Sequence, residues 1–172
     1  WFGLALVVGL AACGSSNGSK SSEPASSPST SSPSDSSSKG GADKKIDACS
    51  LISDAEAVAM LGEPLTNSGQ GAGVGQSVCE WDTESSYSVT ISVGTPGTAP
   101  DDKLTLDPVL GTPQPVASLN GKGSYVGSGT VYFTAGTRLN SVQVVTADFG
   151  GAADRTKAEE LATQLVPKIA GA

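Results

Sequence analysis

The chain of 172 residues contains no histidine, which limits the chemistry that its side chains could perform. Histidine is the general base in Ser-His-Asp and Cys-His catalytic arrangements and the commonest protein ligand of zinc. Catalysis by a serine and a lysine would need the spacing Ser-x-x-Lys. That spacing occurs at Ser36–Lys39, in a serine-rich segment with nothing to desolvate the lysine. The sequence therefore predicts that the protein is not an enzyme, and it indicates no cofactor.

Three acidic residues, Glu80, Asp82 and Glu84, alternate along a predicted strand. Residues two apart share a strand face, so their carboxylates should lie together, opposite Cys79 and Trp81. Clustered carboxylate oxygens suit Ca²⁺, and paired carboxylates can hydrolyse glycosides. We favour a solvated strand face or a charged sheet edge, because no Asp-x-Asp-x-Asp-Gly loop accompanies the row. A metal site at Glu80, Asp82 and Glu84 is the alternative.

Cys13 ends an apolar stretch, Trp1–Ala12, and opens onto a serine-rich tract. The stretch is shorter than the roughly 20 residues of a membrane-spanning helix, and it is typical of the hydrophobic region of a secretion signal. We expect residues 1–12 to be a signal peptide truncated at its start. Leu10–Cys13 resembles the bacterial lipobox, in which the cysteine thiol takes a diacylglycerol. The alternative is an ordinary secretory signal with a chance cysteine.

Lipidation of Cys13 would anchor the mature chain in the lipid bilayer, on the extracytoplasmic face of the cell membrane. Residues 13–45 would then form a disordered tether, because 14 of the 24 residues from Ser15 to Ser38 are serine and offer little apolar surface to bury. A flexible chain of this length reaches about 30 Å.

The remaining residues, 46–172, fit one domain with a modest core. They carry six Lys or Arg against fourteen Asp or Glu, a formal charge of −8. This charge repels phosphate backbones, so nucleic acid is excluded as a natural partner.

Cys49 and Cys79 are the two thiols left to the domain. In an oxidising compartment a disulfide is the natural interpretation, and it would stabilise the fold by roughly 3.5 kcal/mol. A redox or metal site is the rival interpretation, disfavoured because the chain has no histidine and no Cys-x-x-Cys.

The pattern along the domain predicts helix, then strands, then helix. Ser53 and Glu56 form a capping box ahead of a helix over Asp54–Leu61, and Gly62 should end it. The alternating glycines from Gly69 to Gly75 predict a flexible connection rather than a phosphate cradle. Period-two patterns predict strands over Gln76–Glu84, Tyr87–Val93, Thr130–Ala135 and Asn140–Ala147.

Asn120-Gly121 after Val116–Leu119 indicates a tight hairpin turn, whereas residues 94–115 show no clear period and are expected to be loop. A second helix should run from about Asp154, and Pro167 should end or kink it near Val166. These elements predict an α+β domain, with a mainly antiparallel sheet of about five strands and an N-terminal and a C-terminal helix packed on it.

Three stretches together carry a family resemblance: Asp47–Gly62 (DACSLISDAEAVAMLG), Cys79–Trp81 (CEW) and Leu119–Gly127 (LNGKGSYVG). In this order after a lipobox, they resemble the actinobacterial lipoproteins grouped as domain of unknown function 3558. The resemblance implies a lipid-anchored protein on the outer face and supplies no reaction. Some members carry further cysteines toward the C-terminus, which this chain lacks.

The sequence thus leaves three classes of function open. We favour a binding module for an unknown small molecule or envelope protein, with its ligand on the sheet or among residues 94–115. The alternatives are an accessory or sensor subunit of an envelope complex and, less favoured, a hydrolase that uses carboxylates. We expect Trp81 to pack in the core rather than to contact a ligand.

Overall fold

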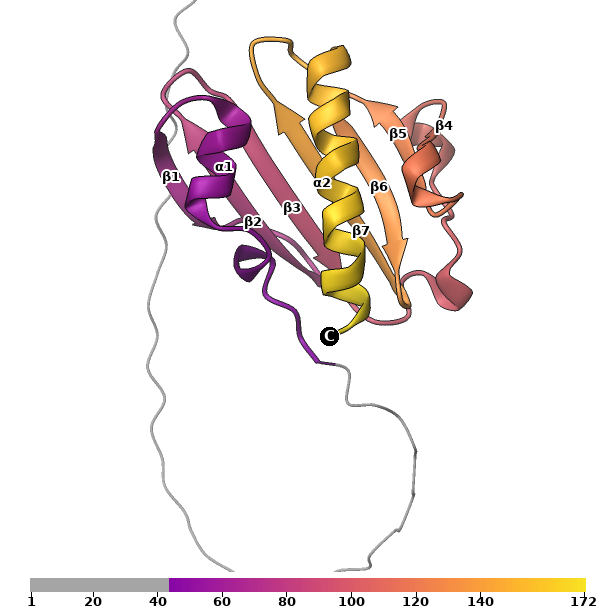
Figure 1. Ribbon diagram of the computed structural model, residues 1–172. Helices are drawn as coiled ribbons and strands as arrows, with labels where there is room; N and C mark the ends of the chain where they lie inside the picture. Colours follow the sequence, from indigo (N-terminus) through magenta and orange to yellow (C-terminus); the bar gives the residue numbers. More distant parts are fainter. Residues whose placement is uncertain (1–43) are drawn as a thin grey trace, which may run out of the picture. The chain divides into compact units, whose positions relative to one another are not determined.

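A seven-stranded antiparallel sheet is the framework of the domain in the computed structural model, which describes residues 44–172 (Figure 1). The strand order is β1-β2-β3-β7-β6-β5-β4. The strands are β1 (Leu65–Gln70), β2 (Gln76–Thr83), β3 (Ser88–Gly94), β4 (Gln114–Pro115), β5 (Gly123–Gly127), β6 (Thr130–Ala135) and β7 (Arg138–Val145). The α-helices are α1 (Asp54–Leu61) and α2 (Ala152–Ala170). Short 3₁₀ turns are η1 (Ala48–Ser50), η2 (Pro100–Asp102), η3 (Pro108–Leu110) and η4 (Ala117–Leu119).

The predicted α+β class and antiparallel sheet are confirmed, but the sheet has seven strands rather than about five. The first missed strand is β1, in which Gly69 pairs with Glu80 of β2. The expected flexible connection is therefore wrong for Gly69. This edge strand carries a bulge between Leu65 and Asn67 and buries little, so its sequence lacks an apolar period.

The second missed strand, β4, has two residues and lies within the segment expected to be loop. Gln114 pairs with Tyr125 and Pro115 with Ser124, which places a proline at the sheet edge. The Asn120-Gly121 turn forms as predicted, with Lys122 N donating to Leu119 O at 2.9 Å. The residues just before it form η4 instead of a strand, so β4 and β5 are the arms of that hairpin.

Both α-helices form, and the first matches its prediction closely. Ser53 Oγ accepts from Glu56 N at 3.3 Å, Glu56 accepts from Ser53 N at 2.7 Å, and Gly62 ends the helix with φ 79°. In α2 the expectation that the helix ends near Val166 is wrong, because it continues through Pro167 to Ala170. Proline this close to a helix end removes one hydrogen bond of the last turn, which the preceding packed turns tolerate.

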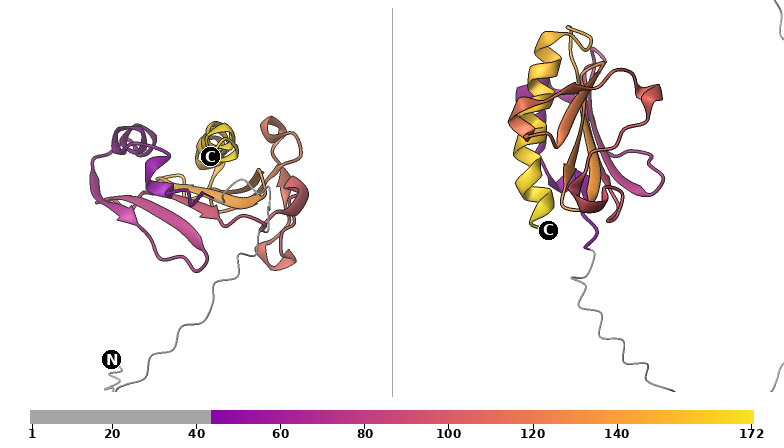
Figure 2. Two further views of the ribbon diagram at one scale, coloured as in Figure 1. Left: turned by 90° about the horizontal axis from the view of Figure 1, so that it is seen from below. Right: turned by 90° about the vertical axis from the view of Figure 1, so that its right-hand side faces the viewer.

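The core lies between the sheet and both α-helices, which cover the same sheet face (Figure 2). Alternate strand residues point into it, among them Val89, Ile91, Val131, Phe133, Val142 and Val144. The buried stripe of α2 supplies Ala158, Leu161, Ala162, Leu165 and Ile169. The other sheet face carries neither α-helix (Figure 2).

A disulfide joins Cys49 of η1 to Cys79 of β2, as predicted, with the two Cα atoms 5.0 Å apart. Trp81, two residues after Cys79 on β2, is buried, and its Nε1 donates to Asp54 Oδ1 at 2.9 Å. Its indole therefore belongs to the core, where α1 supplies the polar partner that a buried indole needs.

Candidate functional site

The sheet face without helices is lined with hydroxyl and amide side chains. In one row across the strands, Ser92 pairs with Ser141, which pairs with Tyr132. In the next row, Thr90 pairs with Gln143. All five side chains are half-buried. This part of the face thus presents hydrogen-bonding groups that solvent or a bound molecule can reach.

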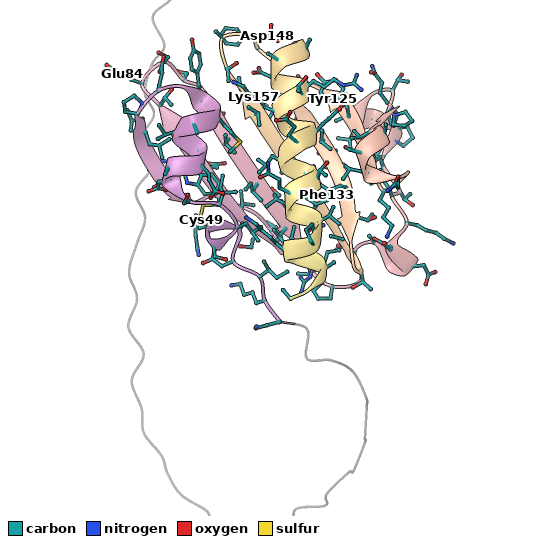
Figure 3. The ribbon with its side chains drawn as sticks, viewed as in Figure 1. Cys49, Glu84, Tyr125, Phe133, Asp148 and Lys157 are labelled. Atoms are coloured by element: carbon teal, nitrogen blue, oxygen red, sulfur yellow. A yellow bond between two sulfur atoms is a disulfide. The ribbon has the colours of Figure 1, made fainter. Side chains whose placement is uncertain are left out.

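The predicted acidic row borders this face but does not gather into one site. Glu80 and Asp82 lie on β2, where Asp82 Oδ2 accepts from Asn67 Nδ2 at 3.2 Å. Glu84 is exposed beyond the end of β2, toward the same end of the sheet as Asp148 (Figure 3). Within residues 44–172, no three Asp, Glu, His or Cys side chains lie close enough to hold a metal ion together.

A cleft opens at the end of the sheet where β2 begins, β3 ends and β7 begins, the lower end in Figure 1. Its volume is about 380 Å³. The lining residues are Lys45, Ile46, Gly75, Gln76, Ser77, Val93, Gly94, Thr95, Pro96 and Arg138. A smaller hollow of about 190 Å³ shares Gly75, Gln76 and Gly94 with it and reaches Tyr132 and Ser141 of the polar face. The cleft and the smaller hollow therefore share a rim at Gly75, Gln76 and Gly94.

Arg138 is the charged side chain buried in this cleft, at 9% exposure. Its Nη1 donates to Gly94 O at 2.8 Å, and its Nη2 donates to Lys44 O at 2.7 Å. The guanidinium thus fastens the entering chain segment to the end of β3. The sequence pattern does not point to Arg138, because the predicted strand begins at Asn140. Extending the period of two back by one pair, from inward-facing Asn140 to Arg138, would have found it.

The opposite end of the sheet holds a buried carboxylate, Asp154, in the first turn of α2. It accepts from Thr146 N at 3.0 Å, from Thr146 Oγ1, and from Gly150 N at 2.7 Å. Burial by itself would raise the pKa of Asp154, but the hydrogen bonds from Thr146 and Gly150 outweigh it and hold the pKa below its usual value. Sequence analysis placed Asp154 only as a helix start.

Tyr125 contacts the loop between β7 and α2 at the same end of the sheet (Figure 3). Its hydroxyl donates to Gly150 O at 2.8 Å, and the Arg155 guanidinium lies 4.7 Å from its ring centroid. Arg155 also pairs with Glu159. The loop from β7 to α2 is therefore held from several sides, and it presents Phe149 to solvent at 75% exposure.

Two further clefts each contain a pair of glutamates. One of about 300 Å³ lies between α1 and α2 and includes Glu56 and Glu160. Hydrogen bonds from Ser53 lower the pKa of Glu56, because they stabilise its carboxylate as a helix cap. The other cleft, of about 480 Å³, includes Glu159 and Glu160. In each pair one carboxylate already has a structural partner, Ser53 or Arg155.

Cys13, the expected lipidation site, lies outside the described residues. None of the helices in residues 44–172 has the length and apolar character that crossing a membrane would require.

The chain folds into a small disulfide-bonded α+β domain with a cleft at one end of its sheet. The sequence matches the family described as protein of unknown function (DUF3558) over residues 8–168, and the chain belongs to that family. No curated protein and no solved structure matches it at a significant level.

Proposed function

We propose that the protein is a lipid-anchored binding module on the extracytoplasmic face of the cell membrane, with its ligand in the cleft between β2, β3 and β7. The observation that carries this proposal is the cleft itself. Its volume of about 380 Å³ lies within the range of small-molecule sites. Its wall combines apolar Ile46, Val93 and Pro96 with a few polar groups, the usual composition of such sites.

Two observations support the anchored, extracytoplasmic part of the proposal. The Cys49–Cys79 disulfide is of the kind that persists in oxidising compartments. The family match begins at residue 8, so it includes the Leu10–Cys13 stretch that resembles a lipobox. The acyl chains on Cys13 would hold the module at the bilayer surface.

Metabolic labelling tests the anchor. Bacteria expressing the chain behind a lipoprotein signal sequence are fed an alkyne analogue of palmitate, and we expect label on the protein and its recovery with membranes. Cys13→Ser should abolish both, whereas Ser16→Ala, a matched change nearby, should preserve them. Recovery of the unaltered protein without label would refute lipidation.

A thermal-unfolding assay tests the cleft. A molecule that binds only the folded state raises the unfolding temperature by mass action. We expect the low-molecular-mass fraction of the host envelope to raise it for the unaltered chain but not for Gln76→Trp, which crowds the rim shared by both hollows. Lys103→Trp, at an exposed position outside these hollows, is the control and should respond normally. An absent shift, or an equal shift in Gln76→Trp, would contradict the proposal.

Crosslinking on the polar sheet face distinguishes a small-molecule binding module from an accessory or sensor subunit. A photo-crosslinking residue in place of Thr90 should give no discrete protein adduct in intact cells if the module binds a small molecule. A single adduct that is lost when neighbouring Gln143 is replaced by Arg would favour the subunit instead.

A further inference from the structure

We infer that the cleft binds a carboxylate-bearing small molecule whose anionic group pairs with Arg138. This inference rests on the proposed function and adds the chemical class of the ligand. It is carried by three observations: the unused donors of a buried guanidinium, the local charge, and the apolar wall beside it.

Arg138 has more donors than the structure uses. A guanidinium carries five N–H groups in a planar fork. Hydrogen bonds to Gly94 O and Lys44 O engage two of them. Within residues 44–172, no Asp or Glu oxygen lies in ion-pair range of Arg138, since the salt bridges there join Lys122 to Asp102 and Arg155 to Glu159. A buried cation without an opposite charge is costly, and a carboxylate that enters the cleft would offset that cost.

The charge of the cleft is opposite in sign to the net charge of the domain. Residues 46–172 carry a formal charge of −8, which repels anions in general. The cleft, however, is lined by Arg138 and Lys45, and among residues 44–172 no acidic side chain lines it. Anion binding is therefore favoured at this place on an otherwise acidic domain, and the planar fork of arginine matches a carboxylate better than a lysine would.

The rest of the wall indicates what the carboxylate should be attached to. Ser77 Oγ accepts from Ala48 N at 3.0 Å, which leaves its own O–H free to donate into the cleft. Ile46, Val93 and Pro96 provide apolar surface on the same cleft. This combination suits a small carboxylate on an apolar body rather than a highly charged phosphate ester.

Titration of the purified chain with sodium hexanoate, followed by amide NMR, tests the inference. We expect saturable shifts at Ser77, Gly94 and Thr95, and much weaker binding of the uncharged hexanamide. Arg138→Gln should weaken hexanoate binding at least about 10-fold, because a charge-assisted pair is lost. Arg138→Lys should recover part of the affinity, and Lys45→Gln should weaken it about threefold. Lys103→Gln, which removes the same charge at an exposed position outside the cleft, should leave it unchanged.

A well-dispersed amide NMR spectrum of Arg138→Gln would show that this variant folds. If the variant does not fold, Lys45→Gln provides the test. The inference would be overturned if hexanamide bound as tightly as hexanoate, or if inorganic phosphate bound more tightly than hexanoate. It would also be overturned if Arg138→Lys and Lys45→Gln both bound hexanoate as tightly as the unaltered chain. The absence of hexanoate binding would overturn it as well. If the envelope fraction still stabilises the chain in a Gln76-dependent way, only this inference fails and the proposed binding function stands.

Discussion

Two buried charged side chains, Asp154 and Arg138, lie at opposite ends of the sheet, and they are the two such residues in the described part of the chain. Asp154, in the first turn of α2, accepts three hydrogen bonds from Thr146 and Gly150 of the preceding loop. Arg138 donates to two backbone carbonyls and faces a cleft. One charge is fully used by the fold, whereas the other keeps donors available. This difference is what we expect if one end of the sheet serves stability and the other serves the proposed ligand binding.

The largest effect should follow removal of the carboxylate that the fold uses. Asp154→Ala leaves the N–H groups of Thr146 and Gly150 without their acceptor, so we expect a loss of about 3 kcal/mol in the free energy of unfolding. Urea denaturation measures it. Glu84→Ala, at an exposed carboxylate, should change stability by less than about 0.5 kcal/mol. An Asp154→Ala variant as stable as Glu84→Ala would break the comparison.

A smaller effect on stability is expected at the opposite end. Arg138→Gln keeps a hydrogen-bonding side chain near Gly94 O and Lys44 O, and it removes a buried charge that has no Asp or Glu partner within residues 44–172. We expect a loss of about 1 to 1.5 kcal/mol, in the same urea experiment. A loss equal to that of Asp154→Ala would show that Arg138 serves the fold as fully as Asp154 does, and the contrast between the ends would fail.

The exposed cap of α1 sharpens the comparison, because it resembles the Asp154 network in function but not in burial. Ser53→Ala removes one capping acceptor, and solvent can hydrate the freed N–H of Glu56. We expect a loss of about 1 kcal/mol. Ser50→Ala, a nearby exposed serine outside the capping box, is the matched control and should lose less. If Ser53→Ala cost as much as Asp154→Ala, burial would not be what makes the Asp154 network strong.

Much of the fold could be predicted from sequence because its signals are local. The Ser53 and Glu56 capping box, the Asn120-Gly121 turn and the period of two along β3 are all confirmed. The two strands that were missed, β1 and β4, are edges stabilised by backbone pairing with β2 and β5, and their side chains are largely exposed. Such pairing leaves no apolar pattern for a single sequence to show.

The candidate site was less accessible to sequence analysis for a related reason. Its residues come from the entering segment and from β2, β3 and β7, which are far apart in the chain, so no spacing connects Lys45, Ser77 and Arg138. The sequence predicts that the ligand lies on the sheet or among residues 94–115. The structure places only the first residues of this segment, Gly94, Thr95 and Pro96, in the cleft. Proximity of this kind follows from strand order, which local patterns do not encode.

The smallest expected effect is the loss of unfolding free energy as pH falls. The lowered pKa of Asp154 lies below the value of about 3.9 for an unfolded aspartate, so the unfolded chain binds its proton first as pH falls. The stabilising contribution of Asp154 is therefore complete above about pH 5 and is lost as pH falls through the folded-state pKa. We expect the unaltered chain to lose more unfolding free energy between about pH 5 and pH 3 than Asp154→Asn does, with urea denaturation as the measurement.

Glu56 gives the matched case, since its pKa is also lowered, by hydrogen bonds from Ser53, but at an exposed site. Glu56→Gln should flatten the acid dependence less than Asp154→Asn, because solvent already stabilises the Glu56 carboxylate in the unfolded chain almost as well. Equal slopes for the unaltered chain and Asp154→Asn would mean that the hydrogen bonds to Asp154 do not favour its charged form. In that case the end of the sheet at Asp154 would be no more specialised for stability than the end at the cleft.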